Sequence, residues 1–258
     1  MTTDQRKVAL VTGAGKRIGR VIALALAERG WDVLVHFRTS AAEAADTVRA
    51  IERQGQRALA LQCDLADVVQ VRALIPSALA LLGPDAQLCC VVNNASLFAQ
   101  DSAADFSETL LDAHMHANLR APILLAQALH AATAEGAQSV VINLLDQKLF
   151  NLNPDFLSYT LSKAALQAAT VMLAQALAPK LRVVGVAPGI TMVSGDQSDA
   201  GFLQAHTITP LGSSSTPQDI AAAVCYLADA QAVTGTTLIV DGGQHLIPLA
   251  RDVMFLAG

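Results

Sequence analysis

A tyrosine and a lysine four positions apart are the side chains in this sequence best suited to move a proton. Tyr159 and Lys163 begin and end the stretch Tyr-Thr-Leu-Ser-Lys. On a helix, residues i and i+4 share a face, so the lysine ammonium would lie near the phenol. A nearby cation favours phenolate and would lower the pKa of Tyr159 toward neutrality, which makes this phenol a candidate proton donor. A surface Tyr–Lys pair is the alternative interpretation.

A glycine cluster near the N-terminus is the second candidate site. The segment reads Thr12-Gly13-Ala14-Gly15-Lys16-Arg17-Ile18-Gly19 and lies between the first predicted strand and the first predicted helix. Glycines let the backbone approach a pyrophosphate, and the N-terminus of the following helix offers unpaired N–H groups and a positive dipole end. A plain turn is the alternative, but the position between strand and helix favours a dinucleotide site.

The loop after the second predicted strand indicates which dinucleotide binds. It reads His36-Phe37-Arg38-Thr39-Ser40, with no acid where an NAD enzyme usually holds the ribose hydroxyls. Arg38, with Ser40 and Thr39, could bind the extra 2′-phosphate of NADP through charge-assisted hydrogen bonds. An exposed loop arginine is the alternative. Together with the glycine cluster, the loop predicts NADPH as the cofactor.

These residues need a frame of alternating strands and helices. Short runs rich in Val, Ile and Leu, without polar alternation, are typical of strands buried on both faces of a parallel sheet. They alternate with helical patterns, which predicts right-handed βαβ units. The sequence therefore predicts an α/β fold of the Rossmann type, with a doubly wound, seven-stranded parallel sheet. We expect a single domain over residues 1–258, with a cofactor half at about 1–100 and a substrate and catalytic half at about 100–258.

The expected elements follow one another closely along the chain. The predicted strands are Lys7–Val11, Asp32–Phe37, Ala58–Gln62, Leu88–Val92, Ser139–Leu144, Arg182–Ala187 and Thr237–Val240. The predicted helices are Ile18–Arg29, Ala41–Gln54, Val68–Leu82, a long region around Leu110–Ala134, Ser158–Ala178 and Gln218–Ala230. The segment Thr191–Ser215 is richer in Gly, Ser, Asp and Thr, which predicts a mobile segment near a site.

Composition excludes several classes of function. The 258 residues are 53% hydrophobic and 15% charged, with a formal net charge of -5. No basic run points to nucleic acid, and no stretch of about 18 apolar residues points to a membrane span. The polar start Met1–Lys7 does not resemble a signal peptide, so we expect a cytoplasmic enzyme. The four cysteines form no CxxC and the six histidines no HExxH, so no metal site is expected.

Taken together, these motifs resemble those of the short-chain dehydrogenase/reductase family. The signatures TGxxxxxG, DL, NNA, YxxxK, PG and VDGG occur in the family's order and span nearly the whole chain. The resemblance implies that Asn118, on the long helix, orders a water in a proton relay through the lysine. It also implies contacts to the cofactor from Asp64-Leu65, Asn94-Ala95 and Pro188-Gly189-Ile190. The complete predicted cofactor site is Gly13, Gly15, Arg17, Ile18, Gly19, His36, Arg38, Thr39, Ser40, Asp64, Leu65, Asn94, Ala95, Tyr159, Lys163, Pro188, Gly189 and Ile190.

The departure from the family pattern that bears most on the reaction lies thirteen residues before Tyr159. The family usually has a serine there, which hydrogen-bonds the substrate carbonyl, whereas this sequence has Asp146. An ionised carboxylate cannot donate a hydrogen bond and would repel a developing oxyanion. Asp146 therefore argues against a simple ketone and favours a substrate with a C=N bond, whose nitrogen must receive a proton. A structural role, or a protonated carboxyl in a dry site, is the alternative.

Four departures resemble the pteridine reductase branch of this family, which includes bacterial dihydromonapterin reductases. They are Arg17, Ser96, Phe98 and Asp146. The resemblance implies that Phe98 stacks on a pterin held against the nicotinamide, a geometry suited to hydride transfer. Ser96 would contact the pterin, and Arg17 would reach both the pyrophosphate and the pterin. With Tyr159 these residues form the predicted substrate site, although Phe98 packed on the core is the alternative.

The sequence thus predicts NADPH-dependent reduction of a dihydropterin to a tetrahydropterin. Tyr159, Asp146 and Lys163 would manage the proton. The alternatives are a short-chain reductase of another carbonyl or imine, and a non-catalytic NADP-binding sensor, which would not need Tyr159, Lys163 and Asn118 together. Family resemblance suggests a homotetramer assembled through the alanine-rich helix Ser158–Ala178, and Thr191–His206 is predicted to be a lid.

Overall fold

Seven parallel strands form the central sheet of the protein, for which a computed structural model describes residues 5–193 and 199–255. The strand order is β3-β2-β1-β4-β5-β6-β7, and all neighbouring strands run in parallel. The predicted α/β fold, a doubly wound seven-stranded sheet in a single domain, is confirmed. The strands are β1 (Arg6–Val11), β2 (Asp32–Phe37), β3 (Ala58–Gln62), β4 (Ala86–Asn93), β5 (Ser139–Leu144), β6 (Leu181–Pro188) and β7 (Thr237–Val240).

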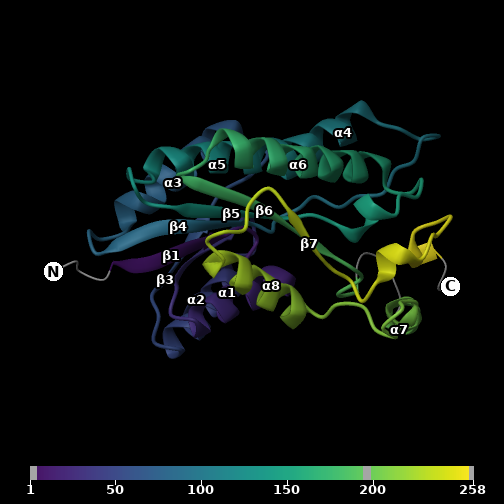
Figure 1. Ribbon diagram of the computed structural model, residues 1–258, viewed down its shortest axis with the longest axis horizontal. Coiled ribbons are helices and arrows are strands. Elements are labelled where there is room, and N and C mark those ends of the chain that lie inside the picture. The colour runs from purple at the N-terminus through teal and green to yellow at the C-terminus, as the bar shows by residue number, and fades with distance from the viewer. Residues whose placement is uncertain (1–4, 194–198, 256–258) are drawn as a thin grey trace.

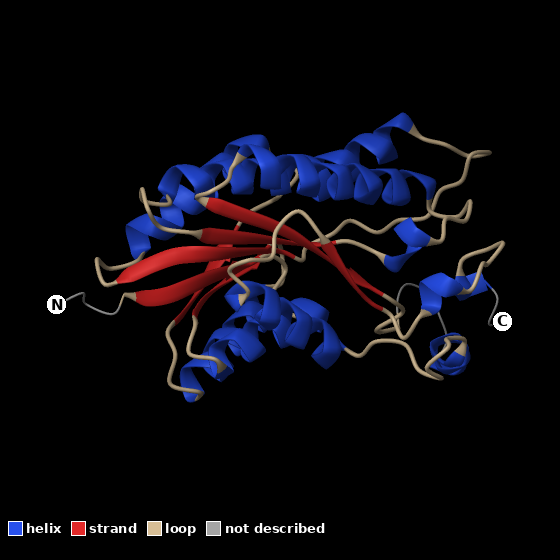
Figure 2. Ribbon diagram, viewed as in Figure 1, coloured by secondary structure: helices blue, strands red, loops and turns tan. Residues whose placement is uncertain are grey.

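Helices cover both faces of the sheet (Figures 1 and 2). One layer packs α1 against α2 and α8, and the other packs α5 against α3 and α6. The helices are α1 (Arg17–Glu28), α2 (Ala41–Arg53), α3 (Val68–Leu81), α4 (Glu108–Met115), α5 (Ala121–Ala132), α6 (Leu157–Ala176), α7 (Asp199–Thr207) and α8 (Pro217–Asp229). Because the strands are parallel, all their carboxyl ends lie at one edge, where loops from distant parts of the chain meet.

Two apolar clusters, one on each face of the sheet, explain why the strands contain so few polar residues. Successive side chains of a strand point to opposite faces. In β1, Ala9 and Val11 therefore join the cluster under α1 and α8, while Val8 and Leu10 join the cluster under α3 and α5. All four are fully buried. This double burial fixes the register of the strands and hence the position of the loops at their carboxyl ends.

The long helical region expected around Leu110–Ala134 contains a π-helical turn. Between α4 and α5 the residues His116–Arg120 form a π-helical turn. Pro122 has no N–H, so the backbone carbonyl of Asn118 loses the donor that an ordinary α-helix would supply from that position. The side chain of Asn118 is 1% exposed and points into the protein at this turn. The predicted long helical region is therefore present, and Pro122 provides a physical reason for the π-helical turn within it.

The segment Thr191–Ser215, which the sequence predicts to be a mobile segment near a site, contains α7. This helix has only nine residues and includes Gly201, so its periodic signal in the sequence is weak. Residues 194–198 of the predicted lid lie outside the described residues. Beyond β7 the chain returns to the carboxyl edge of the sheet through two short 3-10 turns, Gln244–Leu246 and Val253–Phe255. Within the described residues, no helix is long and apolar enough to span a membrane.

Candidate active site

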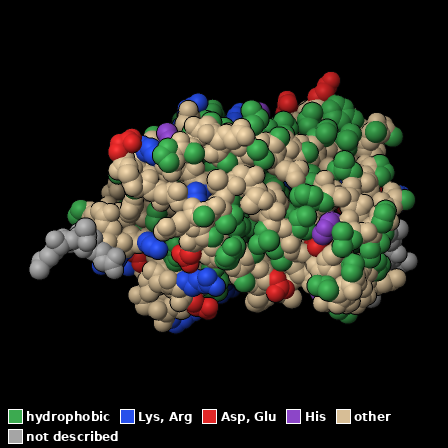
Figure 3. Space-filling model, in the orientation of Figure 1, with side chains coloured by type: hydrophobic (Ala, Val, Ile, Leu, Met, Phe, Trp, Pro, Cys, Tyr) green, Lys and Arg blue, Asp and Glu red, His purple; other side chains and the backbone are tan. Residues whose placement is uncertain are grey.

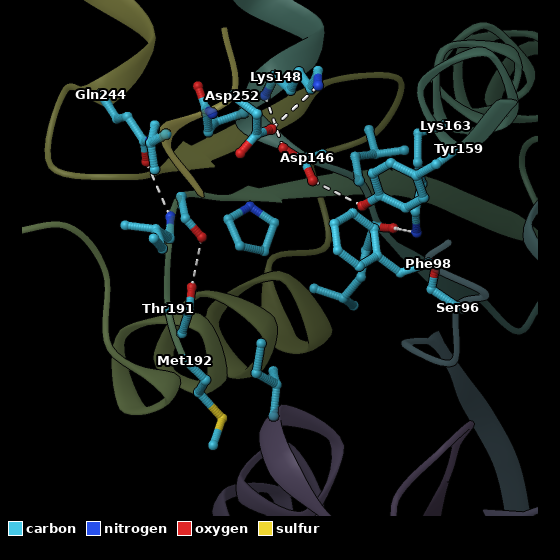
Figure 4. Close-up of a pocket in the computed structure, with 18 of the residues that line it drawn as sticks. Ser96, Phe98, Asp146, Lys148, Tyr159, Lys163, Thr191, Met192, Gln244 and Asp252 are labelled. Atoms are coloured by element: carbon cyan, nitrogen blue, oxygen red, sulfur yellow. Dashed lines mark hydrogen bonds and ion pairs between the residues drawn. The ribbon is translucent and has the colours of Figure 1, made fainter. Parts of the chain in front are cut away.

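Two adjoining cavities lie at the carboxyl ends of the strands. The glycine-loop cavity, of about 520 Å³, is lined by the β1–α1 loop and by the loops after β2, β3 and β4. The tyrosine cavity, of about 270 Å³, is lined by residues from the ends of β5 and β6, from α6 and from the C-terminal segment (Figure 4). Four residues line both: Arg17, Ile18, Asn94 and Ser96. A ligand that occupies both cavities would therefore pass across these four residues.

The glycine loop packs too closely for side chains at two of its glycines. Gly13 has a φ of +65°, in the left-handed region that glycine adopts without strain. A Cβ on Gly19 would overlap the backbone carbonyl of Gly13 and the side-chain amide of Asn94. Asn94 in turn donates from Nδ2 to the carbonyl oxygen of Thr12 at 2.8 Å, which ties the loop after β4 to the loop after β1. At these glycines the loop therefore lines the cavity with backbone atoms that no side chain covers.

His36 holds the glycine loop in place through hydrogen bonds of both its ring nitrogens. The backbone N–H of Gly13 donates to Nδ1 of His36 at 3.0 Å, so Nε2 carries the proton and bonds the carbonyl of Cys63, also at 3.0 Å. Burial lowers the pKa of His36 to about 4, which keeps the ring neutral and this pattern intact. Both ring nitrogens are therefore used within the protein. His36 lines the glycine-loop cavity, but its contacts indicate that it positions the loop.

Arg17 occupies a position where the backbone favours glycine. Its φ of +54° lies in the left-handed region, which costs a residue with a Cβ roughly 1 kcal/mol. Its guanidinium donates to the carbonyl of Val193 at 2.8 Å, and the residue lines both cavities. The family's glycine at this position therefore has a conformational reason. The arginine gains contacts at the junction of the cavities at the expense of a strained backbone.

We expect Arg17→Gly to raise stability and reduce ligand binding at once. Removal of the left-handed strain should increase the free energy of unfolding by about 1 kcal/mol. Loss of the guanidinium should weaken NADPH binding about 10-fold or more. Denaturant unfolding and NADPH titration measure the two effects. The matched control is Arg20→Gly. Arg20 is an exposed residue within α1, so this variant should lower the free energy of unfolding by about 1 kcal/mol. Equal destabilisation by both variants would contradict the strain argument.

The remaining predicted nucleotide contacts gather around the same cavity. Arg38, Thr39, Ser40, Asp64 and Leu65 all line it. Arg38 and Thr39 are exposed, and the Arg38 guanidinium makes no hydrogen bond or ion pair with any residue in the described ranges. Asp64 is half-buried and caps its own loop by accepting from the N–H of Ala66 at 2.9 Å. A positive group without a hydrogen-bonding or ionic partner among the described residues thus lines the cavity.

Tyr159, Asp146 and Lys163 meet in the tyrosine cavity, as the sequence predicts (Figure 4). The phenol donates to Oδ2 of Asp146 at 2.8 Å. Asp146 comes from the loop after β5, and Tyr159 and Lys163 come from successive turns of α6. Lys163 donates from Nζ to the carbonyl of Leu144 at 2.7 Å, and Nζ lies 5.8 Å from the centre of the Tyr159 ring. The three groups therefore form one cluster of ionisable side chains, in which Tyr159 and Lys163 are buried and Asp146 is half-buried.

The prediction that Lys163 lowers the pKa of Tyr159 is wrong for this geometry. Burial, reinforced by the charge and hydrogen bond of Asp146, raises the pKa of Tyr159 well above its usual value. The carboxylate is hydrogen-bonded to the phenol directly, whereas the ammonium is directed at a backbone carbonyl. Burial also raises the pKa of Asp146. Tyr159 is thus held as a neutral phenol, in the protonation state that a proton donor requires.

The pKa of Lys163 leads to a pH prediction. Burial lowers this pKa to about 8, so the ammonium is present below that pH and absent above it. Because the ammonium stabilises the charge left on Tyr159 after proton donation, we expect kcat for reduction to fall as pH rises through about 8. A pH profile of kcat, compared with that of Lys163→Met, measures the effect. A wild-type profile that stays level through this pH would contradict the assignment.

Phe98 stands in the cavity against two other aromatic rings. Its ring stacks on Phe156 at 4.5 Å between centres and meets Tyr159 edge-on at 4.8 Å. Phe98 is nevertheless 41% exposed. Packing on the core is the alternative to ligand contact for Phe98. This packing covers only part of the Phe98 ring. The exposed part faces the cavity that Tyr159 and Asp146 also line.

Asn118 braces the loop that carries Phe98. Its Oδ1 accepts from the N–H of Leu97 at 2.8 Å and from Oγ of Ser96 at 3.2 Å, and its Nδ2 donates to Oγ of Ser162 at 3.0 Å. None of these bonds reaches Lys163. The predicted relay through Asn118 stays a prediction. Its side chain is occupied in holding the loop.

The C-terminal segment supplies site residues that sequence reasoning missed. Gln244 and Asp252 line the tyrosine cavity together with Lys148. Lys148 donates from Nζ to Oδ2 of Asp252 at 3.2 Å and to the carbonyl of Asp155 at 2.6 Å. The Arg251 guanidinium binds both carboxylate oxygens of Asp155. No motif marks these residues, and Lys148 and Asp252 are 104 positions apart, so only the fold brings them together.

The end of β6 and the loop after it form one wall of the tyrosine cavity. Pro188, Gly189 and Ile190 line it, as expected for the predicted cofactor site. A Cβ on Gly189 would come within 2.7 Å of the Cβ of Asp241, so this strand end approaches β7 too closely for any other residue. Asp241 accepts from the N–H of Gly243 at 2.9 Å and so shapes the turn that follows β7.

Comparison with known proteins agrees with this arrangement of motifs and strands. A family model described as enoyl-(acyl carrier protein) reductase matches residues 13–245. The chain belongs to the short-chain dehydrogenase/reductase family. Membership in this family of oxidoreductases confirms the prediction of an oxidoreductase.

Relatives of this short-chain dehydrogenase/reductase carry several activities. The structure of FolM alternative dihydrofolate reductase 1 from Brucella canis, complexed with NADP, has a TM-score of 0.90 and 36% identity, covering 97% of this chain and 98% of that one. An uncharacterised oxidoreductase of Methylorubrum extorquens is 35% identical over 94% of this chain and 99% of its own length. The 3-oxoacyl-[acyl-carrier-protein] reductase FabG of Staphylococcus aureus is 32% identical over 93% of this chain and 98% of its own.

Proposed function

We propose that this protein is an NADPH-dependent reductase of dihydropterins. The observation that carries the proposal is the hydrogen bond from Tyr159 to Asp146, in a cavity that Phe98 also lines. A carboxylate at this position is unsuited to hydrogen-bond a carbonyl oxygen but suited to hold the donor phenol. The likeness to the FolM structure supports a substrate of this chemical class.

The glycine-loop cavity fits an NADP molecule. Bare backbone at Gly13, the N-terminus of α1 and the exposed Arg38 provide for a pyrophosphate and a 2′-phosphate. The shared wall at Arg17, Ile18, Asn94 and Ser96 would lead the nicotinamide toward Tyr159. When bound, NADPH supplies the hydride. The NADP in the Brucella canis structure supports this cofactor.

Arg38 should decide between the two nicotinamide dinucleotides. We expect wild type to prefer NADPH and Arg38→Ala to lose about 1.5–3 kcal/mol of that preference, because one charge-assisted contact with the 2′-phosphate disappears. The kcat/KM values for NADPH and NADH in both proteins provide the measurement. The NADH value should barely change in the variant, which makes it the internal control. Equal use of both dinucleotides by wild type would refute the role of Arg38.

The chain's own residues would deliver the proton. Tyr159 donates it from the phenol to the nitrogen of the substrate C=N bond. Asp146 fixes the phenol in place through the 2.8 Å hydrogen bond, and burial raises the pKa of its carboxyl group. Lys163 stabilises the negative charge that remains on the phenol after transfer. Phe98 would hold the flat ring of the substrate by stacking, with Ser96 and Arg17 at its edge.

A substrate screen tests this proposal against its main competitor. The FabG relative favours reduction of the 3-oxo group of an acyl thioester, which Asp146 opposes, and the description of the matching family model favours reduction of an enoyl group. NADPH oxidation should therefore be measured with 7,8-dihydropterins, dihydrofolate, a 3-oxoacyl thioester, simple ketones and quinones. We expect turnover with dihydropterins and little with ketones or the thioester. Turnover of the thioester or of ketones alone would overturn the proposal. An NADP-binding sensor would turn over none of these substrates.

Assembly and location stay predictions. On the α6 surface, Leu161, Val171 and Met172 are 46%, 43% and 67% exposed, which is compatible with a homotetramer that buries this helix. Size-exclusion chromatography with light scattering would measure the number of subunits.

A cytoplasmic location remains an expectation from the sequence. Within the described residues no group of three or more potential ligands could hold a metal ion, and the proposed chemistry requires none.

A further inference from the structure

Gln244 presents an unused donor to the tyrosine cavity. The residue directly follows the VDGG turn and is only 2% exposed, yet it lines the cavity. Its Oε1 accepts from the backbone N–H of Ile190 at 3.0 Å and lies 3.5 Å from Oγ of Ser214. Its Nε2 makes no hydrogen bond with any residue of the described ranges. A buried amide nitrogen with an empty donor needs a partner, and the cavity is where a partner can lie.

The orientation of this amide is fixed by its neighbour. The backbone N–H of Ile190 can only donate, so the oxygen of Gln244 must face it. The NH₂ group must then face the other way. Figure 4 shows Gln244 held by this bond, on the side of the cavity away from Ser96 and Phe98. The donor is therefore a fixed feature of the cavity wall.

Asp252 provides an acceptor in the same cavity. Its carboxylate receives Nζ of Lys148 on Oδ2, and the side chain is 20% exposed. The N–H of Asp252 donates to the carboxylate of Asp155 at 2.7 Å, so the backbone at this point is anchored too. A donor at Gln244 and an acceptor at Asp252 match a hydroxyl group, which accepts one hydrogen bond and donates another.

We propose that Gln244 is a specificity-determining residue, which selects substrates with a hydroxyl on the ring substituent. The inference rests on the proposed function, because a ring placed against Phe98 and Tyr159 leaves the Gln244 side of the cavity to the substituent. The hydroxyl accepts from Nε2 of Gln244 and donates to the carboxylate of Asp252. A methyl group at the same point would leave the buried amide without a partner, which disfavours such a substrate.

Two dihydropterins that differ by one hydroxyl test the inference. They are 6-hydroxymethyl-7,8-dihydropterin and 6-methyl-7,8-dihydropterin, each with NADPH. We expect wild type to favour the hydroxymethyl compound by about 10-fold or more in kcat/KM, because its hydroxyl makes two hydrogen bonds, one of them to a carboxylate, that the methyl group cannot make. Because both compounds share the reacting C=N bond, the ratio reports the substituent and cancels effects on the chemistry.

The variants are chosen to change the donor while keeping the fold. Gln244→Glu retains an oxygen for the Ile190 N–H but replaces the NH₂ with an acceptor. Asp252→Asn retains an oxygen for Lys148 but removes the charge. The matched control is Gln218→Glu, which adds the same charge at an exposed position on the first turn of α8. Thermal unfolding and NADPH titration accompany each measurement.

The inference predicts that Gln244→Glu and Asp252→Asn bring the ratio of the two kcat/KM values close to one, while Gln218→Glu leaves it at the wild-type value. A wild-type ratio near one overturns the inference and leaves the proposed function standing. If Gln244→Glu keeps the wild-type ratio, the inference is also overturned and the proposed function still stands, whether or not the two kcat/KM values fall together. Failure of wild type to reduce either compound overturns the proposed function and the inference with it.

Discussion

Tyr159→Phe should abolish most turnover and leave NADPH binding nearly unchanged. In the proposed reaction the phenol gives a proton to the substrate, and the Asp146 carboxylate accepts a hydrogen bond from it at 2.8 Å. General acid catalysis is worth roughly 10²–10⁴-fold, so we expect kcat to fall by a factor in that range. The phenol contributes little to dinucleotide binding, so the Kd for NADPH should change by less than about 3-fold.

The second tyrosine of the chain provides the control. Tyr226 is 57% exposed on α8 and lines neither of the two cavities, so Tyr226→Phe should leave both kcat and Kd as in wild type. Steady-state kinetics and fluorescence titration of NADPH measure the two quantities. Near-normal kcat in Tyr159→Phe would mean that water delivers the proton and that the Tyr159–Asp146 bond is structural.

Asp146→Ser should weaken dihydropterin reduction about 30- to 1000-fold in kcat/KM. The substitution removes a buried charge that holds the phenol, which should cost about 2–4 kcal/mol of transition-state stabilisation. Asp146 also caps the turn Gln147–Phe150 by accepting from the N–H of Lys148 at 2.9 Å. Serine can cap a helical turn as well, so the loss should appear in the kinetics and the melting temperature should change little.

The exposed Asp112→Ser on α4 is the matched control, since it removes one carboxylate away from both cavities. The kcat/KM values for a dihydropterin and for a simple ketone should be measured in wild type and both variants. We expect Asp146→Ser to lose activity with the dihydropterin and to gain with the ketone, because serine can donate to a carbonyl oxygen. Unchanged dihydropterin reduction would assign Asp146 a purely structural role.

Much of the fold and of the chemistry could be predicted from local patterns. The stretches Val8–Val11 of β1 and Val140–Ile142 of β5 are apolar, so their burial on both faces could be predicted, and the loops after these strands carry residues that line the two cavities. The spacing of Tyr159 and Lys163 follows helix geometry directly. Asp146 could be placed beside Tyr159 because a motif of the family relates the two positions.

The parts that could not be predicted depend on tertiary contacts or on backbone conformation. Nothing local in the sequence shows that Arg17 adopts a left-handed conformation. The direction of the pKa shift of Tyr159 follows from burial and from where the Lys163 ammonium points, neither of which spacing reveals. Gln244 and Asp252 belong to the cavity only because the chain returns to it after β7. α7 is too short to give a clear periodic signal.

An isotope experiment tests the central claim most directly. Wild-type protein is incubated with a 7,8-dihydropterin and NADPH that carries deuterium on the transferable position of the nicotinamide, prepared as each of its two stereoisomers. Mass spectrometry then follows the pterin. The account predicts that one of the two stereoisomers gives a tetrahydropterin with a single deuterium on the carbon of the former C=N bond, in amounts equal to the NADP formed. Unlabelled pterin with both stereoisomers, or NADPH consumption without tetrahydropterin, would contradict it.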